Sequence, residues 1–455
     1  MIALFNFGGQ TMAERLSVVG LGKLGLCLAA CFADKGFETI GVDVDEHVVD
    51  DVNHGITPII ESGLDVLVAR NRGRNLRATL NHREAIEQSE ITFVLVATPS
   101  KSDGTFSNQY IESALQSLAT AYKNSQKQRH LFVISSTVMP GSTDGCFIPL
   151  LEIYSGRKLH VDFEVCYDPD FVALGNVVRD FLNPDLVVIG ETSAEAGQRL
   201  EAIHRKMCEN RPQISHMSVV NAEIAKVCVN AFVTLKISFA NSVANLCERI
   251  PGADVDAITQ AIGADKRISP HYFRGGLGFG GTCFPRDTKA FISLAEKYGS
   301  PADLVQATAR VNSYQDNHLS EIVLREADEF NDERIGILGL AFTLNTPVIT
   351  ESPSIKLIKV LLEKGLSVVV FDPLAMANTR TVFGDAIEYA GSAEECLEKS
   401  RIYVVATRLK DYKQAIEAYK PGKPFTVIDC WRILDPTQLD TQIKYVPLGR
   451  YFTKQ

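Results

Sequence analysis

A glycine-rich stretch near the middle of the chain, GFGGTCFPRD (residues 278–287), combines residue types that can do covalent chemistry. A cysteine thiolate is a strong nucleophile, so Cys283 could attack an electrophilic carbon, while the glycines beside it would let the backbone close around a ligand. Asp287 follows four residues later, where it could serve the same reaction or cap a helix that begins there. Cys283 is one of ten cysteines, so the stretch alone leaves open whether it is a nucleophile or part of a tight turn.

A second glycine pattern, GLGKLG at residues 20–25, is typical of a dinucleotide-binding turn because it follows a strand-like run and opens a helix-like one. The first glycine would allow the tight turn, the second the approach of a pyrophosphate, and the third close packing of helix on strand. The next predicted strand ends near Asp43, whose carboxylate would bind a ribose 2′-hydroxyl and repel a 2′-phosphate, so we predict NAD as the cofactor. The predicted cofactor residues here are Gly20, Leu21, Gly22, Lys23, Leu24, Gly25 and Asp43.

Two threonines end later strands of the same predicted sheet. Thr98 precedes Pro99, and Thr137 follows Ser136. Ligands of open parallel sheets bind beyond the carboxyl ends of the strands, so we predict that Thr98 and Thr137 contact the cofactor. Ordinary turn residues at strand ends would give the same pattern.

The elements that would position these residues alternate between strands and helices at both ends of the chain. This alternation predicts an α/β fold with parallel sheets and helices on both faces, and the two ends resemble a duplicated nucleotide-binding architecture. The predicted strands lie at residues 16–22, 37–45, 91–99, 131–138, 186–190, 334–342, 366–373, 400–407 and 424–430, with helices at 23–36 and 352–365.

Between the two α/β regions, residues 219–249 contain no Gly or Pro and repeat apolar residues with helical spacing. They predict one helix of ~30 residues and ~45 Å that ends before Pro251, long enough to link two domains and to form a dimer interface. Lys226 and Asn230 lie one turn apart on one face of it. A solvated lysine and an asparagine at a helix contact are the simpler interpretations of these two residues.

Composition limits the class of protein. A chain of 455 residues predicts two or three domains, and the net charge of −9 does not suit a nucleic-acid partner. The cysteines form no CxxC pair and no zinc-ligand spacing, which predicts no metal site and a reducing, cytoplasmic location. The first residues are expected to form an irregular extension rather than a signal peptide, and no uninterrupted apolar run reaches the ~18–20 residues that cross a bilayer, so no membrane partner is expected.

Several motifs together resemble the UDP-glucose/GDP-mannose dehydrogenase family, over about residues 17–434. They are VVGLGKLGLCLAACFADKGFETIGVDVD, VATPS, SSTVMPGST, RDFLNPDLVVIG, AEIAKVCVNAFVTLKISFAN, IGADKRI, GFGGTCFPRDTKA and ESPSIKLI, in the family's order. The resemblance implies an N-terminal Rossmann-like NAD-binding domain (1–212), a central helical domain that forms a homodimer (213–318) and a C-terminal Rossmann-like nucleotide-sugar-binding domain (319–455). It also implies oxidation of a sugar C6 alcohol to a carboxylate with two NAD.

The resemblance implies a role for each motif residue. Cys283 would form a thiohemiacetal and then a thioester, Asp287 and Asn230 would hold the hydrolytic water, and Lys226 would stabilise the oxyanion. Asp170, with Thr137, would act as a base or hold a water, and Arg267 would reach the substrate of the partner subunit. The substrate-binding residues implied are Asp170, Lys226, Asn230, Arg267, Phe273, Arg274, Gly275, Phe279, Gly280, Phe342 and Arg432.

The sequence departs from the family pattern mainly where the nucleotide sugar would be held. Asp170 stands for a glutamate, and Leu174 for a second acidic residue. Three cationic positions have changed: Thr343 replaces a lysine, and Thr350 and Trp431 replace arginines. Arg432, next to Trp431, and Arg274 could supply charge instead. The oxidation machinery therefore matches the family better than the nucleotide-sugar clamp does.

The leading hypothesis is an NAD-dependent nucleotide-sugar 6-dehydrogenase of polysaccharide biosynthesis, which oxidises UDP-glucose to UDP-glucuronate. The alternatives are the same reaction on a UDP-N-acetylhexosamine or GDP-mannose, and a two-electron dehydrogenase of the β-hydroxyacid type that uses Lys226 and Asn230 without a thiol. A third is a non-catalytic nucleotide-sugar binder.

Overall fold

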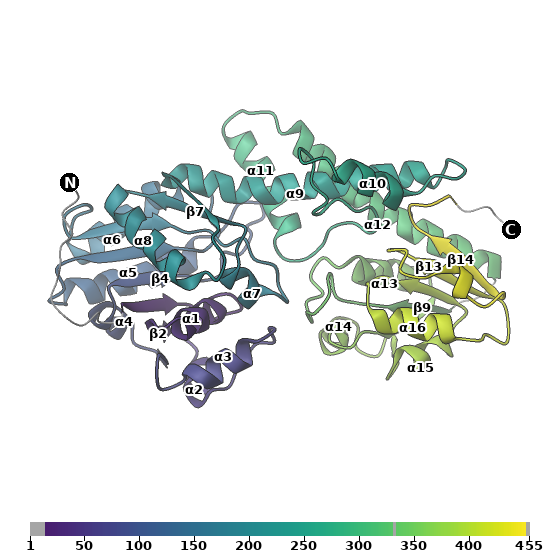
Figure 1. The fold of residues 1–455 in the computed structure, drawn as a ribbon, viewed down its shortest axis with the longest axis horizontal. Coiled ribbons are helices and arrows are strands. Elements are labelled where there is room, and N and C mark those ends of the chain that lie inside the picture. The colour runs from purple at the N-terminus through teal and green to yellow at the C-terminus, as the bar shows by residue number, and fades with distance from the viewer. Residues whose placement is uncertain (1–13, 331–333, 452–455) are drawn as a thin grey trace. The chain divides into compact units, whose positions relative to one another are not determined.

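The computed structural model describes residues 14–330 and 334–451. The chain divides into two compact units, one ending at Lys226 and the other beginning at Val227 (Figure 1). Most of the predicted irregular extension before the first strand lies at residues 1–13, outside the described ranges.

The first unit is built on one eight-stranded sheet with the order β3-β2-β1-β4-β5-β6-β7-β8. Neighbouring strands are parallel, except that β6 and β7 are antiparallel. The strands are β1 (Arg15–Val19), β2 (Glu38–Val42), β3 (Leu76–Thr79), β4 (Ile91–Val94), β5 (His130–Ile134), β6 (Phe163–Tyr167), β7 (Leu186–Glu191) and β8 (Gln213–Ser218).

Helices cover both faces of this sheet because its central strands are apolar on both sides. In β5, Leu131 and Val133 belong to one hydrophobic core, whereas Phe132 and Ile134 belong to the other. The helices are α1 (Gly25–Asp34), α2 (Glu46–His54), α3 (Leu64–Asn71), α4 (His82–Gln88), α5 (Gln109–Lys123), the π-helix η1 (Thr143–Phe147), α6 (Ile148–Ser155), α7 (Val177–Leu182) and α8 (Ala194–Met207).

The predicted long helix is present as α9 (Val219–Cys247), and the boundary between the two units falls within it. Its length and composition alone would allow it to cross a membrane, with a mean hydropathy of 1.4 over an 18-residue window. Core helices of globular proteins meet the same criterion. Glu223 and Asn241 on this helix are 0% exposed and are hydrogen-bonded to the backbone of Thr143 and Gly276, which is the environment of a helix in a globular protein.

The second unit continues with α10 (Val255–Gly263), α11 (Phe284–Lys297) and α12 (Asp303–Phe330), followed by a six-stranded parallel sheet. The sheet has the order β11-β10-β9-β12-β13-β14. Its strands are β9 (Arg334–Leu338), β10 (Ser367–Phe371), β11 (Glu388–Tyr389), β12 (Ile402–Val405), β13 (Phe425–Asp429) and β14 (Ile443–Pro447). Its helices are α13 (Pro353–Glu363), α14 (Met376–Phe383), α15 (Ala393–Leu397), α16 (Lys410–Ala418) and the 3-10 helix η2 (Pro436–Gln438).

The six strands of this sheet follow the same spatial order as the first six strands of the other sheet. In each sheet the chain adds strands toward one edge and then returns to add the remaining strands toward the other edge, and this change of order falls between β1 and β4 and between β9 and β12. This is the order of a dinucleotide-binding Rossmann sheet, in which ligands bind at the reversal point. The α/β fold with two nucleotide-binding sheets, predicted from the sequence, is therefore confirmed.

Candidate active site

The glycine turn between β1 and α1 has the geometry that dinucleotide binding needs. Gly20 has a φ of +95°, and a Cβ added there would lie 2.5 Å from the Leu95 carbonyl oxygen. A Cβ on Gly25 would lie 1.8 Å from the Gly20 oxygen, so the third glycine allows α1 to pack on the turn. Gly22 has no neighbour within 4 Å of the corresponding point. The open space at Gly22 and the adjoining helix N-terminus suit a pyrophosphate.

Asp43 lies directly after β2 and is joined to this turn. One of its carboxylate oxygens accepts a hydrogen bond from the Leu21 amide at 2.7 Å, and the other accepts from the amides of Val44 and Asp45 at 2.8 and 3.0 Å. These bonds hold the carboxylate beside the glycine turn. That position agrees with the predicted contact to a ribose hydroxyl.

The carboxyl ends of β4 and β5 are linked by hydroxyl groups. Thr98 donates a hydrogen bond to the Thr137 carbonyl at 2.8 Å. The Ser136 hydroxyl donates to the Val96 carbonyl at 2.7 Å and accepts from the Val96 amide at 2.9 Å. Thr98 and Ser136 therefore have structural partners, whereas Thr137 is half-buried and its hydroxyl has no hydrogen-bond partner among the described residues.

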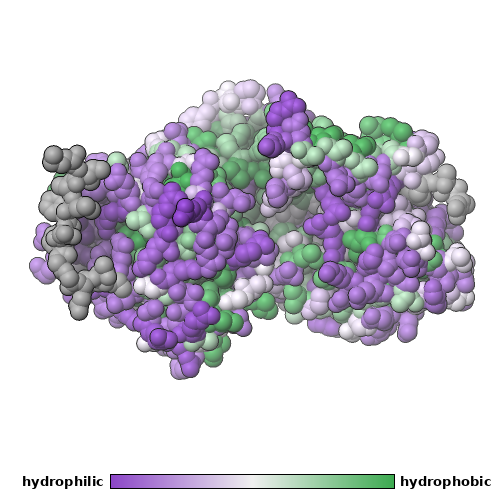
Figure 2. Space-filling view, in the orientation of Figure 1, coloured by the Kyte–Doolittle hydropathy of each residue, from purple (hydrophilic) through white to green (hydrophobic). Residues whose placement is uncertain are grey.

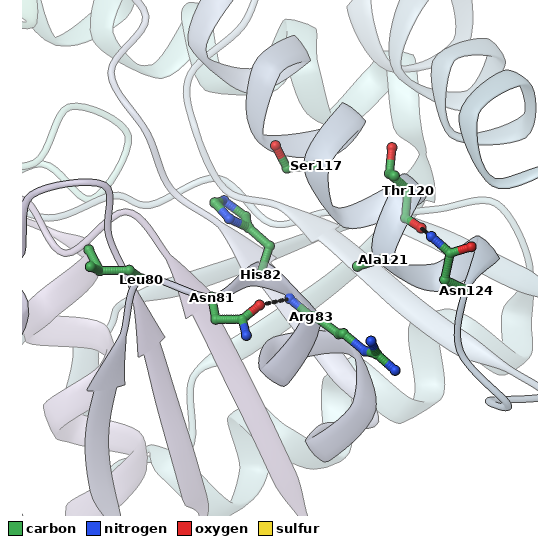
Figure 3. Close-up of a pocket in the computed structure, with 8 residues that line it drawn as sticks. All are labelled: Leu80, Asn81, His82, Arg83, Ser117, Thr120, Ala121 and Asn124. Atoms are coloured by element: carbon green, nitrogen blue, oxygen red, sulfur yellow. Dashed lines mark hydrogen bonds between the residues drawn. The ribbon is translucent and has the colours of Figure 1, made fainter.

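A shallow pocket elsewhere in the first unit lies between the start of α4 and one face of α5 (Figure 3). Asn81 begins α4 there, and its side chain accepts a hydrogen bond from the Arg83 amide. None of the predicted site residues lines this pocket, so it has no part in the predicted chemistry. Its lining residues are Leu80, Asn81, His82, Arg83, Ser117, Thr120, Ala121 and Asn124.

Lys226 is buried, which excludes the simpler interpretation of a solvated helix lysine. It is 8% exposed, its ammonium donates a hydrogen bond to the Asp170 carbonyl, and it lies 5.0 Å from the centre of the Phe171 ring. Glu223, one turn earlier on α9, anchors the helix start: its carboxylate accepts hydrogen bonds from the Gly141 amide at 2.6 Å and the Thr143 amide at 3.0 Å. Sequence reasoning missed Glu223, although an acidic residue within an apolar helix was a visible signal.

The Asp170 carboxyl group lies in an unusual environment. Its Oδ2 atom is buried and accepts no hydrogen bond from the described part of the chain. Burial, and secondly the charge of Asp168, raise the pKa of Asp170 to about 8, against the opposing effect of Lys226. The group is therefore mostly protonated at neutral pH and can exchange a proton in the physiological range, as a general acid or base requires.

Asp168 is itself paired with a buried histidine. Nε2 of His204 lies 3.0 Å from each carboxylate oxygen of Asp168. Burial is the largest effect and lowers the pKa of His204, but the charge and hydrogen bond of Asp168, together with Cys208, outweigh it, so the net shift is upward. The pair gives Asp168 a hydrogen-bonded counter-charge, whereas Oδ2 of Asp170 has no hydrogen-bond partner among the described residues. No local sequence pattern signals this pair, because 36 residues separate Asp168 from His204.

The second unit brings together Cys283, Asp287 and Asn230. Cys283 is exposed and is the N-cap residue of α11, whose first turn contains Pro285. Asp287 is 0% exposed; its Oδ2 accepts a hydrogen bond from Asn230 at 2.6 Å, and its Oδ1 accepts one from Arg286 at 2.9 Å. Asp287 is therefore not the helix cap considered as a simpler interpretation. It lies one turn into α11 and links this helix to α9.

The glycines before Cys283 pack against protein backbone. A Cβ on Gly280 would lie 2.3 Å from the Glu351 carbonyl oxygen, and the Gly281 amide, at a φ of +81°, donates to the Thr350 carbonyl at 3.0 Å. Asn312 of α12 clamps Phe279, accepting from its amide at 2.7 Å and donating to its carbonyl at 3.0 Å. Close packing within the unit thus explains why positions 280 and 281 are glycines. The predicted closure of this backbone around a ligand is not needed to explain them.

Of four other predicted substrate residues in the second unit, one packs beside this loop. A Cβ on Gly281 would touch the Phe342 ring at 2.5 Å, so Phe342 packs beside the loop. Phe273 is buried and stacks on Phe239, with ring centres 6.0 Å apart. Gly275 lies against α9, because a Cβ there would be 2.7 Å from the Ala240 carbonyl oxygen. Arg267 is 87% exposed and pairs with Asp265 at 2.6 Å, so its guanidinium lies at the surface.

The prediction that Arg432 binds substrate conflicts with its contacts. Its Nε and Nη2 atoms donate to both carboxylate oxygens of Asp256 at 2.7 and 2.9 Å, and Nη2 also donates to Gly275. Its Nη1 donates to the carbonyls of Leu448 and Cys430. All five N–H groups of an arginine are thereby used, and the side chain is 0% exposed. Arg432 has a structural role and no free donor for a ligand.

Two sheets of nucleotide-binding order, a dinucleotide-type turn with a carboxylate beside it and a cysteine at a helix N-terminus define the class of protein as a nucleotide-binding oxidoreductase. Three models of one family match the chain in order: the UDP-glucose/GDP-mannose dehydrogenase NAD-binding domain at residues 14–208, its central domain at 220–314 and its UDP-binding domain at 336–436. The chain belongs to the UDP-glucose/GDP-mannose dehydrogenase family.

Individual relatives agree with this assignment. The chain is 36% identical to UDP-glucose 6-dehydrogenase AglM of Haloferax volcanii over 92% of its length and 97% of that protein. It is 33% identical to GDP-mannose 6-dehydrogenase of Azotobacter vinelandii over 79% of its length and 81% of that protein. The solved UDP-glucose dehydrogenase of Pyrobaculum islandicum superimposes with a TM-score of 0.88 at 32% identity, over 98% of this chain and all of that one. The predicted enzyme class and the NAD cofactor are confirmed.

Proposed function

We propose that this enzyme oxidises the C6 alcohol of UDP-glucose to the carboxylate of UDP-glucuronate through a covalent intermediate on Cys283. The observation that carries the proposal is the group in the second unit: an exposed cysteine at the N-terminus of α11, one turn from a buried aspartate that is hydrogen-bonded to Asn230. A two-electron alcohol dehydrogenase has no use for a nucleophile there. The identity to UDP-glucose 6-dehydrogenases supports the choice of sugar.

The turn at Gly20, Gly22 and Gly25 and the carboxylate of Asp43 would hold NAD, which would supply the hydride acceptor for both oxidations. Between them, the Cys283 sulfur bonds to C6 of the aldehyde, and the carbonyl oxygen takes up a proton to give a thiohemiacetal. The thiohemiacetal loses a hydride and a proton to give a thioester. Water then attacks the thioester carbon, the C–S bond breaks, and the thiol and carboxylate are released. The N-terminal dipole of α11 favours the negative charge that develops at the sulfur and at the oxygen beside it.

The other polar residues would hold the water and stabilise charge. The Asn230 amide is fixed by its bond to Asp287, so its remaining polar atoms keep one orientation toward a water. Lys226, buried one turn earlier on α9, would stabilise the oxyanion, a contribution of about 3–4 kcal/mol for one such donor. Asp170, whose pKa is raised to about 8, would accept and return a proton together with a water held by Thr137.

We also propose that α9 forms a homodimer interface. Phe232, Phe239 and Leu246 recur every seven residues along one face of α9 and are 63%, 56% and 57% exposed. Hydrophobic residues are visible at the surface over α9 and α10 (Figure 2). A repeated apolar stripe of this kind suits packing against the same helix of a second copy. The proposed boundaries of the NAD-binding, dimerisation and nucleotide-sugar domains are 1–212, 213–318 and 319–455, which the three family-model ranges support.

Two weaker observations bear on the cell compartment and the sugar. All ten cysteines are free thiols, which supports a cytoplasmic location. Thr343, Thr350 and Trp431 stand where the family has a lysine and two arginines, so a different nucleotide sugar is also a candidate substrate. The candidates are GDP-mannose, which the similarity to GDP-mannose 6-dehydrogenases supports, and UDP-N-acetylhexosamines.

The purified protein tests the proposal when it is incubated with NAD and each of UDP-glucose, UDP-N-acetylhexosamines and GDP-mannose. Formation of two NADH per UDP-glucose, with the uronate as product, is the expected result. One NADH per sugar, with an aldehyde or ketone product, would instead identify a two-electron dehydrogenase. Binding without turnover would identify a nucleotide-sugar binder.

A further inference from the structure

The substrate of the proposed function carries a diphosphate, and this chain has lost the family's cations at three positions. Thr343, Thr350 and Trp431 occupy those positions, and Arg432 has no free N–H group. A diphosphate bound in a partly buried site needs charged or N–H partners to offset its desolvation. Another cation of the second unit must therefore provide the charged partner of the diphosphate.

Arg408 lies where the fold would place a ligand. It follows β12, whose neighbour is β9, and the order of the second sheet reverses between these two strands. Ligands of such sheets bind beyond the carboxyl ends of the strands at this point. Arg408 was not singled out in the sequence, because the position of β12 in the sheet is not visible there.

Trp431 fixes the position of Arg408. The indole N–H of Trp431 donates a hydrogen bond to the Ala406 carbonyl at 2.8 Å, which ties the ring to the end of β12. The Arg408 guanidinium carbon lies 5.3 Å from the centre of the Trp431 ring. This contact orients the planar donor group, and a guanidinium so held loses less freedom when it binds an anion. Trp431, which replaces a family arginine, thus holds a different arginine, Arg408, in place.

The segment that carries Arg274 runs against the same ring, because a Cβ on Gly276 would lie 2.8 Å from Trp431. The Arg274 side chain is 46% exposed, and the carboxylate within ion-pair distance of it in the described ranges is Asp256, at 3.5 Å, which already pairs with Arg432 and Arg450. Among the described residues, Arg408 has no carboxylate within ion-pair distance. Burial, and secondly the charge of Arg274, lower its pKa. Arg408 therefore lies beside a second cation without a carboxylate of its own to neutralise it.

We propose that Arg408, held against Trp431, binds the diphosphate of the nucleotide sugar together with Arg274, in place of the missing family lysine and arginine. The proposal rests on the proposed function only in that the ligand is a nucleoside diphosphate. Arg408 supplies the charge, and Trp431 acts as a positioning residue for it.

Calorimetric titration of the full-length protein with UDP and with uridine tests this assignment. Arg408→Gln should weaken UDP binding about 10- to 100-fold, as expected for the loss of a charge-assisted hydrogen bond to a phosphate, and should leave uridine binding unchanged within about twofold. Arg408→Lys should recover part of the UDP affinity. In turnover assays with UDP-glucose, Arg408→Gln should raise KM more than it lowers kcat.

Arg380→Gln is the matched control. Like Arg408, Arg380 lies in the second unit against an aromatic ring, with its guanidinium carbon 4.0 Å from the centre of the Tyr389 ring. It belongs to α14 and not to the segment that follows β12. It should bind UDP like the wild type. UDP binding by Arg408→Gln within twofold of wild type, or equal weakening of UDP and uridine, would overturn the assignment. Wild-type protein that binds UDP through Arg408 but oxidises no sugar would overturn the proposed function alone.

Discussion

The two Rossmann sheets are built alike in the glycine turn after the first strand of each and in the aspartate that anchors this turn. In the first sheet, Gly20 donates to the Val42 carbonyl at 2.8 Å, and Asp43 accepts from the Leu21 amide at 2.7 Å. In the second, Gly339, with a φ of +100°, donates to the Phe371 carbonyl at 2.9 Å, and Asp372 accepts from the Leu340 amide at 2.8 Å. The duplicated turn and its aspartate anchor are therefore common to both.

The turns diverge immediately after this anchor. In the first, Gly22 leaves open space and α1 begins at Gly25, so the helix N-terminus faces the turn. In the second, Ala341 stands at the position equivalent to Gly22, and α13 begins only at Pro353. The first turn can hold a pyrophosphate with backbone N–H groups. The second has a longer connection before its helix, so a diphosphate there depends on side chains such as Arg408. The same scaffold thus binds two nucleotides by different means.

The largest expected effect comes from replacing Cys283, the proposed nucleophile, which lies in neither nucleotide-binding turn. Cys283→Ala should lower uronate formation by at least about 10⁴-fold, because no thiohemiacetal can form, while NAD and UDP still bind. NADH release and product analysis check the rate, and calorimetry checks the two affinities. Cys146→Ser, a partly buried cysteine in the first unit, should retain full activity. Uronate formed by Cys283→Ala at an undiminished rate would exclude the thioester route.

Gly22→Ala makes the first turn resemble the second. No protein atom lies within 4 Å of the new methyl group, so the free energy of unfolding should change little. The methyl group would occupy the space for the pyrophosphate and weaken NAD binding about 10- to 100-fold, leaving UDP binding intact. Calorimetry with each nucleotide measures both effects. Unchanged NAD affinity would mean that the cofactor does not approach the turn at Gly22.

The two anchoring aspartates should respond differently to the same substitution. Asp43→Asn should weaken NAD binding and reduce the preference for NAD over NADP, because it removes the negative charge that repels a 2′-phosphate. Asp372→Asn should leave NAD affinity unchanged and lower the free energy of unfolding by about 1–3 kcal/mol, because buried amides lose a charged acceptor. Denaturant titration and cofactor kinetics measure the two outcomes. A loss of NAD affinity in Asp372→Asn would contradict separate roles for the two sheets.

The smallest effect concerns the pH dependence of stability in the first unit. The pKa of Asp170 is raised to about 8 in the fold from an ordinary value of 3.8, so its favourable contribution is complete below pH 4 and declines as pH rises toward 8. Asp170→Asn, which stays neutral, should therefore lose less stability than the wild type between pH 5 and 9. Each pH unit within this range should change the free energy of unfolding by about 1.4 kcal/mol, which at about 2–4 °C per kcal/mol is a difference of a few degrees in Tm. Parallel Tm curves for the two proteins would place the Asp170 pKa outside this range.

Residues close in sequence were the ones whose environment could be predicted. The GxGxxG turn, the aspartate at the end of β2 and the long helix α9 all follow from local periodicity and turn chemistry, and each is found where it was predicted. The exposed thiol of Cys283 and its neighbourhood with Asp287 also fit the predicted nucleophile site, whose catalytic role stays a prediction.

Contacts between distant parts of the chain were missed or misjudged. Asn312 lies 33 residues from Phe279, which it clamps, and Glu223 lies 80 residues from Thr143. Arg432 was predicted to bind substrate, but Asp256, 176 residues away, holds its guanidinium. Only the folded chain brings such groups within the ~3 Å that a hydrogen bond requires.

The sequence by itself determined the class of this enzyme, its NAD turn and the identity of its candidate nucleophile, because glycine torsions, helical periodicity and thiol reactivity are properties of residues and their immediate neighbours. The tertiary structure decided which charges are free to act. Arg432 is held in an ion pair with Asp256, Oδ2 of Asp170 has no hydrogen-bond partner in the described ranges, and Arg408 lies against Trp431. Charge pairing and desolvation depend on which groups the fold places side by side.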